Sequence, residues 1–254
     1  MVIHAEDAQR FDDDGFLLLP ELLPSAAVEE LRGLLLPLFE RLEQLPARAR
    51  NDLGTAPMTP ASGSAVPELL RAIRLEPRLV RTQAYAICHD VARHLAGRSA
   101  GYSYDHVICK PPYTDARVLP HQDQAYTGHR VSLRTVHFWI PLQAVTEENG
   151  CVSYAPGSHR GGLLPHRRVA PSSNALAVDS LDGLPPSVAC PLPSGGVAVH
   201  GPLTVHSTGP NVTPHPRFAW VIHFGPFGRM AKLRPSVLGQ RLLGAFTREH
   251  RSWP

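Results

Sequence analysis

The sequence has 254 residues and a formal net charge of +3, from 25 basic and 22 acidic side chains. Hydrophobic residues make up 43% and charged residues 19%, a balance that excludes a disordered chain and a coiled coil. The small and evenly spread charge argues against binding to nucleic acid or to a membrane surface. A chain of this length can form one large domain, and we expect a single domain over residues 1–254.

Nothing in the sequence indicates secretion or membrane insertion. The first seven residues contain no basic segment followed by an apolar run, as a signal peptide would. The most apolar stretch, residues 16–24, is interrupted by Glu21 and two prolines and is far shorter than the ~18 residues of a membrane span. We therefore expect a cytoplasmic protein with reduced cysteines, and the spacing of these cysteines does not match a zinc site: Cys88, Cys109, Cys151 and Cys190.

The first hundred residues are expected to form a mostly helical support. A helix with leucines at helical spacing follows Ser25, a residue suited to the N-cap, and Pro37 should kink or end this helix. A second helix is predicted over residues 77–96, with an apolar stripe that begins at Val80. The intervening segment 46–67 is rich in Ala, Pro, Gly, Ser and Thr, and we expect a long loop that closes over substrate as a lid.

Short strands separated by turns are predicted from about residue 101 onward. The expected strands cover residues 104–110, 131–142, 151–155, 188–191, 196–200 and 217–224. The dipeptide Asn149-Gly150 between two of them predicts a β-hairpin, because both residues tolerate positive φ angles. This pattern favours an antiparallel sandwich or barrel over residues 101–230, followed by a tail over 231–254 with a helix near 235–246.

Fourteen histidines make any single metal-binding motif weak evidence in this sequence. A His-x-Asp/Glu pattern is expected about once by chance, and it occurs twice, as His4-x-Glu6 and as His121-x-Asp123. We interpret the first as the chance occurrence. On a strand, His121 and Asp123 would point to the same face and could take adjacent positions on one metal ion. Two histidines and one carboxylate suit Fe(II), whereas the alternative is a pair of polar surface residues beside a turn.

The second half of the sequence places a histidine and an arginine on either side of a turn. Glycine, prolines and asparagine between His206 and Arg217 suggest that the two residues lie on neighbouring antiparallel strands, with both side chains in the interior. A guanidinium at the start of an apolar strand is costly to bury without a partner. Its planar fork suits a carboxylate of a dicarboxylic acid, and the alternative is a salt bridge at the strand end.

Taken in order, these motifs resemble the phytanoyl-CoA dioxygenase family. The matching pieces run from about residue 10 to 226: Asp14-Gly15-Phe16, His121-x-Asp123, Trp139-Ile140-Pro141-Leu142 leading into Glu147-Glu148-Asn149-Gly150, Ala155-Pro156-Gly157-Ser158-His159, and His206-x-x-x-Pro210-Asn211 with Arg217. Members of this family are Fe(II)- and 2-oxoglutarate-dependent oxygenases. The resemblance implies a mainly β fold, a double-stranded β-helix (jelly-roll or cupin-like) barrel with N-terminal helices packed on one sheet.

The resemblance also implies roles for individual residues. His121, Asp123 and His206 match the iron ligands, and Arg217 matches the arginine that holds the distal carboxylate of 2-oxoglutarate. Further contacts to 2-oxoglutarate are implied for Thr208, its neighbour Ser207, Trp139 and Lys110. The candidate substrate-binding residues are Tyr104, Gln124, Tyr126, Arg134, His137 and Arg229. His159 is expected to be structural or pocket-lining, His223 could face the pocket, and no role is expected for the other histidines, including His106 and His200.

The function implied by the resemblance is oxidation of an aliphatic C–H bond of a small molecule, such as a secondary-metabolite intermediate. Such a reaction consumes O2 and 2-oxoglutarate and releases succinate and CO2. Halogenases of this type carry Gly or Ala at the carboxylate position, so Asp123 favours hydroxylation or a related oxidation such as desaturation, ring closure or epimerisation. Two alternatives are a jelly-roll metalloenzyme that works without 2-oxoglutarate, for example an isomerase, and a metal-free binding module. An Arg217 remote from the metal ligands would favour the former.

Overall fold

The computed structural model describes residues 3–53, 66–127, 133–170 and 174–226. The predicted C-terminal helix near 235–246 and the candidate residue Arg229 lie outside these ranges, as does the central part of the predicted lid. The assignment of a single domain over residues 1–254 and the role of the lid therefore stay predictions.

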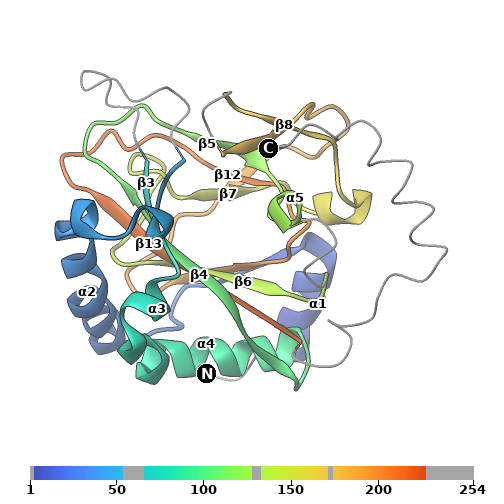
Figure 1. Ribbon diagram of the computed structural model, residues 1–254. Coiled ribbons are helices and arrows are strands. Elements are labelled where there is room, and N and C mark those ends of the chain that lie inside the picture. Colours follow the sequence, from blue (N-terminus) through green and yellow to red (C-terminus); the bar gives the residue numbers. More distant parts are fainter. Residues whose placement is uncertain (1–2, 54–65, 128–132, 171–173, 227–254) are drawn as a thin grey trace, which may run out of the picture.

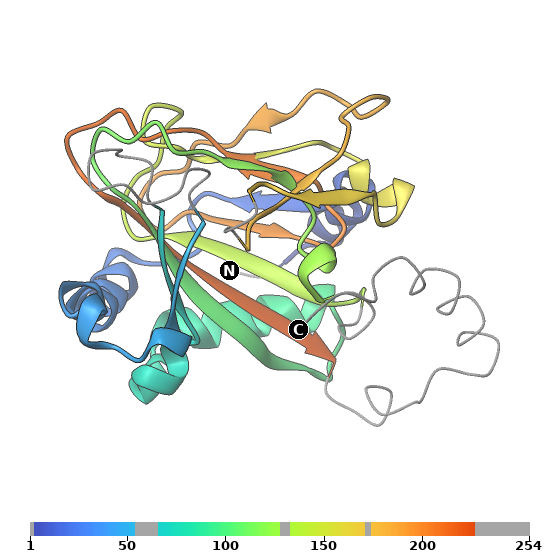
Figure 2. The same ribbon diagram turned by 45° about the horizontal axis from the view of Figure 1, so that its top comes forward.

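Two antiparallel sheets face each other and form the body of the protein (Figures 1 and 2). The large sheet has seven strands in the order β1-β11-β6-β13-β4-β3-β2 and the small sheet has four in the order β10-β7-β12-β5. Their bounds are β1 Phe16–Leu19, β2 Arg50–Asp52, β3 Pro67–Leu70, β4 Ala100–Lys110, β5 Val118–His121, β6 Val136–Pro141, β7 Val152–Tyr154, β10 Val188–Ala189, β11 Val197–His200, β12 His206–Thr208 and β13 Arg217–Pro226. A two-stranded sheet joins β8, His166–Arg168, to β9, Leu176–Val178. The mainly β jelly-roll architecture is thus confirmed, although the described strands leave the two main sheets unjoined at their edges.

The helices lie mostly in the N-terminal part of the chain. They are α1 Ala5–Asp14, α2 Ser25–Glu40, α3 Ala72–Leu75, α4 Gln83–Leu95 and α5 Gln124–Thr127, with short 3-10 turns at Leu42–Gln44, Ala47–Ala49, Pro77–Arg81 and Ser158–Gly161. α2 and α4 pack against the outer face of the large sheet (Figure 1), as expected. Within the described ranges, we find no helix with the length and hydrophobicity that crossing a membrane would require.

The predicted helix boundaries need two corrections. Pro24, not Ser25, is the N-cap of α2, and the helix passes through Pro37 to end at Glu40, because a proline in the last turn removes only one helical hydrogen bond. The helix predicted over 77–96 is divided into a 3-10 turn and α4 by Thr82, whose hydroxyl accepts a hydrogen bond of 3.2 Å from the backbone N–H of Tyr85. This division leaves Val80 on the surface, with 41% of its area exposed.

The turn at Gly150 connects the two main sheets and is not the predicted hairpin. The strand before it, β6, pairs with β11 and β13, whereas the strand after it, β7, pairs with β10 and β12. Only Gly150 has a positive φ, of 79°, while the Asn149 side chain accepts from the Thr146 N–H at 2.9 Å and donates to the Ala144 carbonyl at 3.1 Å. Asn149 therefore stabilises the turn through its side chain, and the chain crosses from one sheet to the other.

The loop predicted over 46–67 also contains regular structure at its ends. Residues 50–52 form β2, which pairs with β3 and extends the edge of the large sheet, with Arg50 opposite Leu69. The four cysteines are free thiols within the protein interior, in agreement with the expectation.

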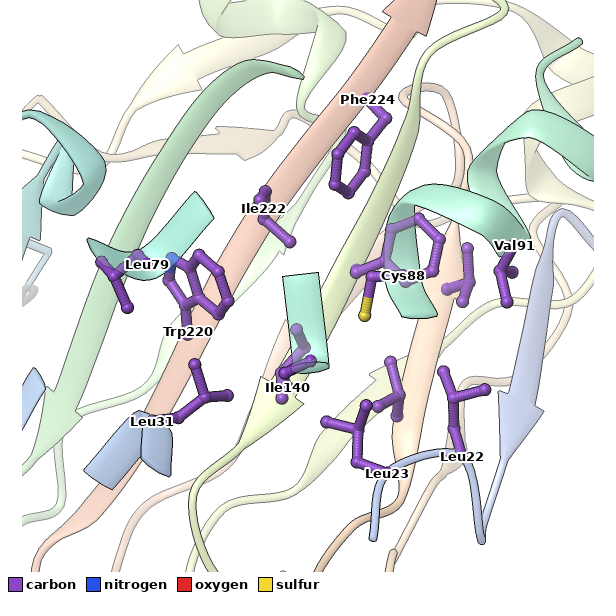
Figure 3. Packing of buried hydrophobic residues seen from close by; sticks show 14 of the residues in the cluster. Leu22, Leu23, Leu31, Leu79, Cys88, Val91, Ile140, Trp220, Ile222 and Phe224 are labelled. Carbon is purple, nitrogen blue, oxygen red and sulfur yellow. The ribbon is translucent and has the colours of Figure 1, made fainter. Parts of the chain in front are cut away.

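The main hydrophobic core lies between the large sheet and the helices. Side chains alternate along β13, so Trp220, Ile222 and Phe224 point away from the small sheet and pack with residues such as Leu31 of α2 and Cys88 of α4 (Figure 3). Burying a side chain of this kind contributes about 1.5–3 kcal/mol. This layer fixes the position of the large sheet, whose opposite face is directed toward the small sheet.

Candidate metal centre

The predicted ligands His121, Asp123 and His206 meet between the two main sheets. His121 ends β5 and lies opposite His206 of the neighbouring strand β12. Oδ1 of Asp123 is 3.4 Å from Nε2 of His121 and 3.5 Å from Nε2 of His206. One potential ligand atom from each of the three lies within 4.8 Å of the others. Asp123 follows the end of β5 and is not on the strand as expected, and the turn into α5 brings its carboxylate to the histidines.

Both histidines present Nε2 to the centre because Nδ1 is already used. Nδ1 of His121 lies 2.8 Å from the Leu119 carbonyl oxygen, and Nδ1 of His206 lies 3.0 Å from that of Thr204. A backbone carbonyl only accepts, so each Nδ1–H donates, and Nε2 is the ring nitrogen left to bind a metal ion. Burial and the proximity of His121 hold the pKa of His206 well below its usual range, so this imidazole is neutral near pH 7. Two imidazole nitrogens and a carboxylate fit a divalent transition metal such as Fe(II).

Asp123 is further contacted by two histidines of the large sheet. Its Oδ2 lies 2.6 Å from Nδ1 of His137 and 3.2 Å from Nε2 of His200. Burial alone would raise the pKa of this carboxyl, but the four surrounding imidazoles hold it well below its usual range. His137 thus faces the site as predicted, whereas a role for His200 was missed. The signal available in the sequence was a histidine at the end of the apolar run Val197–His200, a position where a buried polar group needs a partner.

Arg217 is a buried cation without a protein partner. Its side chain is at the start of β13, the residue is 1% exposed, and none of its three guanidinium nitrogens has a hydrogen-bond acceptor among the described residues. The buried Thr208 hydroxyl likewise lacks a partner there. Burial lowers the pKa of Arg217 to about 10, so the group stays protonated at neutral pH. A buried, unpaired positive charge is strongly unfavourable, and a carboxylate with two oxygens would satisfy it.

A single cavity of about 620 Å³ connects the metal centre with this cation. Its walls include the three predicted metal ligands, and they also include Arg217, Thr208, Ser207 and Trp139. The guanidinium carbon of Arg217 lies 5.4 Å from the centre of the Trp139 ring. Arg217 and His206 line this cavity from opposite sheets. The prediction that they lie on neighbouring strands was wrong, because β12 pairs with β5 and β7 whereas β13 pairs with β4 and β6.

Lys110 does not occupy the predicted position against 2-oxoglutarate. Its amino group donates to the backbone carbonyls of Ala116, at 2.8 Å, and of Gly209, and the residue is not part of the cavity wall. Burial, together with repulsion from Arg217 and Arg117, lowers the pKa of Lys110 to about 6. The side chain therefore holds the segment after β12 in place through its hydrogen bonds, and the lowered pKa leaves the buried amino group largely uncharged at neutral pH.

The candidate substrate-binding residues divide into two groups. Tyr104, Tyr126 and His137 line the cavity, and so does His223, whose ring stacks on that of His137 at 3.6 Å. Gln124 is buried but lies outside the cavity wall, and Arg134 is exposed at the surface. Neither side chain therefore forms part of the cavity wall: Gln124 is buried on the short helix α5, and Arg134 lies in the turn before β6. His159 was expected to be either structural or pocket-lining. It has a structural contact, since its Nε2 lies 3.1 Å from the backbone oxygen of Asp12.

The cavity wall also contains a polar pair that no sequence motif indicated. Nδ1 of His106 contacts Oε1 of Glu68, whose other oxygen accepts from the Asn51 side chain at 2.6 Å. Burial would lower the pKa of His106, but the neighbouring Glu68 carboxylate raises it. These residues come from β2, β3 and β4, and only their pairing in the large sheet brings them together.

Comparison with known proteins places this sequence among dioxygenase relatives. The family model described as "Phytanoyl-CoA dioxygenase (PhyH)" matches residues 11–219. The "Phytanoyl-CoA dioxygenase domain-containing protein 1" of Rattus norvegicus is 32% identical over 122 residues, which are 46% of this chain and 42% of the rat protein. The "Probable phytanoyl-CoA dioxygenase" of Caenorhabditis elegans is 23% identical over 88% of this chain and 75% of its own length. The matched segment thus spans less than half of the rat relative.

Solved structures with the same fold cover most of the chain. EvdO2 from Micromonospora carbonacea var. aurantiaca, crystallised with 2-oxoglutarate, is 29% identical with a TM-score of 0.71 and covers 89% of this chain and 92% of its own. The "non-heme alpha ketoglutarate dependent carbocyclase SnoK from nogalamycin biosynthesis" has the same fold, with a TM-score of 0.70, 24% identity and 92% coverage of both chains. Since the family model matches most of the sequence, this chain belongs to the phytanoyl-CoA dioxygenase (PhyH) family.

Proposed function

We propose that the protein is an Fe(II)- and 2-oxoglutarate-dependent oxygenase that hydroxylates an aliphatic C–H bond of a small molecule, with release of succinate and CO2. The observation that carries the proposal is the unpaired Arg217 guanidinium, buried in the same cavity as His121, Asp123 and His206. A cosubstrate that chelates a metal at one end and carries a carboxylate at the other would engage both features at once. We further propose a secondary-metabolite intermediate as the substrate class and the cytoplasm as the location.

The residues of the chain divide the work between metal and cosubstrate. Nε2 of His121, Nε2 of His206 and Oδ1 of Asp123 would hold Fe(II), and bound Fe(II) supplies the positions for 2-oxoglutarate and O2 and the redox chemistry of the oxidation. Arg217 would form a bidentate ion pair with the distal carboxylate, and the Thr208 hydroxyl would donate a further hydrogen bond. Trp139 forms a wall beside this anchor, with Ser207 close by on the opposite sheet.

Asp123 determines which kind of oxidation we propose. Its carboxylate fills the position that halogenases leave open for chloride, which favours transfer of a hydroxyl group over halogenation. The part of the cavity that Tyr104, Tyr126 and His137 line is the proposed position of the substrate. The two alternative functions are less well supported: an isomerase without 2-oxoglutarate gives no purpose to the buried Arg217, and a metal-free module gives none to the converging donor atoms.

An anaerobic titration tests the proposal. Fe(II) followed by 2-oxoglutarate should produce a visible charge-transfer absorption, and admission of air should then yield succinate, at a rate that rises with the correct substrate. The Arg217→Met variant serves as the matched control and should require far more 2-oxoglutarate for the same absorption. Absence of the absorption in the wild-type protein with Fe(II) bound would contradict the proposed use of 2-oxoglutarate.

A further inference from the structure

Asp123 is held at both oxygens, and the oxygen remote from the metal ligands has two partners of its own. Oδ2 lies 2.6 Å from Nδ1 of His137 and 3.2 Å from Nε2 of His200, and these histidines are 2% and 1% exposed. They are directly opposite each other on the neighbouring strands β6 and β11, so their side chains leave the large sheet on the same face. The large sheet thus supplies two imidazoles to the carboxylate of Asp123, which follows strand β5 of the small sheet.

The protons on these imidazoles can be assigned from their other contacts. Nδ1 of His200 lies 3.0 Å from the hydroxyl of Tyr154, which can donate to it, so the proton of His200 is on Nε2 and is donated to Asp123. Nδ1 of His137 donates to the same carboxylate oxygen, and its ring is fixed by stacking on His223 with 4° between the ring planes. Two N–H donors therefore converge on Oδ2, and both are oriented by further buried contacts.

We propose that His137 and His200 are positioning residues that restrict Asp123 to one metal-binding oxygen, Oδ1. With Oδ2 engaged by two hydrogen bonds, the carboxylate cannot rotate to offer both oxygens to the metal. A carboxylate that bound through both oxygens would occupy one more position on the ion and leave one fewer for a cosubstrate. The inference depends on the proposed function only in that a divalent metal binds at His121, Asp123 and His206.

A second metal ion is the competing explanation for the same contacts. The donor atoms of Asp123, His137 and His200 also lie within 4.8 Å of one another. The separation of 2.6 Å between Nδ1 of His137 and Oδ2 is a charge-assisted hydrogen-bond distance, however, at which the Nδ1–H donates directly to the carboxylate. The hydrogen-bonded arrangement accounts for every contact of Oδ2 without a second ion, and metal stoichiometry distinguishes the two explanations.

Binding of Co(II) alone tests the inference without substrate or 2-oxoglutarate. The affinity and stoichiometry are measured by visible absorption for the wild-type protein and for two pairs of variants. His137→Leu and His200→Leu remove the donors, whereas His137→Asn and His200→Gln keep an N–H near the original Nδ1 and Nε2. We expect one Co(II) per chain, a loss of about 10–100-fold in affinity for the leucine variants, and recovery of most of it for the amide variants.

Two further variants separate positioning from stability. His89→Leu removes a histidine whose Nε2 lies 2.9 Å from the Ala100 carbonyl, away from the cavity, and should leave Co(II) affinity unchanged. Tyr154→Phe removes only the hydroxyl that orients His200, so it keeps the fold and should weaken Co(II) binding several-fold even if a leucine variant fails to fold. Each variant is first checked by thermal unfolding.

The outcomes identify which proposal fails. Unchanged Co(II) affinity in the folded leucine variants or in Tyr154→Phe would overturn the positioning role, and so would two Co(II) ions per wild-type chain. Normal Co(II) results combined with no succinate formation would contradict the proposed function while supporting the role of His137 and His200. A wild-type protein that binds no Co(II) would overturn the metal centre and the positioning role together.

Discussion

The two faces of strand β13 differ in how completely their buried groups are satisfied. On the outer face, Ile222 and Phe224 pack in the main hydrophobic core (Figure 3), and the indole N–H of Trp220 donates to Asp105 at 3.1 Å. On the inner face, Arg217 and His223 both retain buried nitrogens without a partner among the described residues. The outer face therefore stabilises the fold, whereas the inner face keeps unfavourable groups that a ligand can satisfy.

This contrast teaches that stability and function are separated across the thickness of one sheet. Because strand residues alternate in direction, a shift of one position along β13 moves from a residue that supports the core to one that lines the cavity. Substitutions on the outer face should lower the unfolding free energy and leave ligand binding unchanged. Substitutions of the unsatisfied groups on the inner face should weaken ligand binding and leave the unfolding free energy unlowered. Four experiments test this separation.

The largest effect is expected at the metal centre. Asp123→Ala should abolish 2-oxoglutarate turnover coupled to substrate oxidation, a loss of at least about 1000-fold, because the ion loses its one anionic ligand. Succinate formation measures it. The matched control is Glu6→Ala, which removes the acidic residue of the other such pattern, His4-x-Glu6, in the first turn of α1, and should have no effect. Full activity of Asp123→Ala would remove this residue from the ligand set.

On the outer face, Ile222→Ala should lower the unfolding free energy by about 2–5 kcal/mol, because it leaves a space in a packed core. Urea denaturation measures the change. Ile222 is fully buried and is adjacent in sequence to residues of the inner face. The affinity of the folded variant for Co(II) should equal that of the wild type, and a parallel loss of metal affinity would show that the two faces are coupled.

On the inner face, Arg217→Met should weaken binding of 2-oxoglutarate by about 10–100-fold, the loss of a charge-assisted pair. An anaerobic titration in the presence of Fe(II) measures this affinity. The ligand-free variant should be as stable as the wild type or more stable, since it no longer buries a positive charge. Arg134→Met, at an exposed position, is the control, and a less stable Arg217→Met with normal affinity would reverse the assignment of this face.

The smallest effect is a dependence of stability on pH. Burial lowers the pKa of His200, His206 and His223. As the pH decreases toward about 6.5 and below, the unfolded chain therefore takes up protons that the folded chain does not, and the unfolding free energy decreases. His106, whose pKa is raised because Glu68 outweighs its burial, acts in the opposite direction and offsets part of the loss. Between about pH 7.5 and about pH 6 the metal-free protein should lose about 1 kcal/mol.

Thermal unfolding at the two pH values measures this loss. His223→Phe keeps an aromatic ring against His137 and removes one of the titrating groups, so it should reduce the pH dependence. Equal stability of the wild-type protein at both values would contradict the assignment of neutral, buried histidines.

The sequence by itself determined the local features of this protein. Apolar alternation located most of the strands, because the two faces of a strand have different environments and so require different residues. The motif order identified the family, and with it His121, Asp123, His206 and Arg217. These residues share one cavity, as the sequence analysis required.

Only the tertiary structure decided how distant strands combine. Three features depend on pairing and packing between segments far apart in the chain: the contacts of His200 and His137 with Asp123, the place of Asn149 in a turn that connects two sheets, and the contacts of Lys110 with backbone carbonyls. Hydrogen bonds between strands and the contact of one sheet with another are set by the whole core rather than by neighbouring residues. For that reason the sequence indicated the metal ligands but not the side chains that hold them in position.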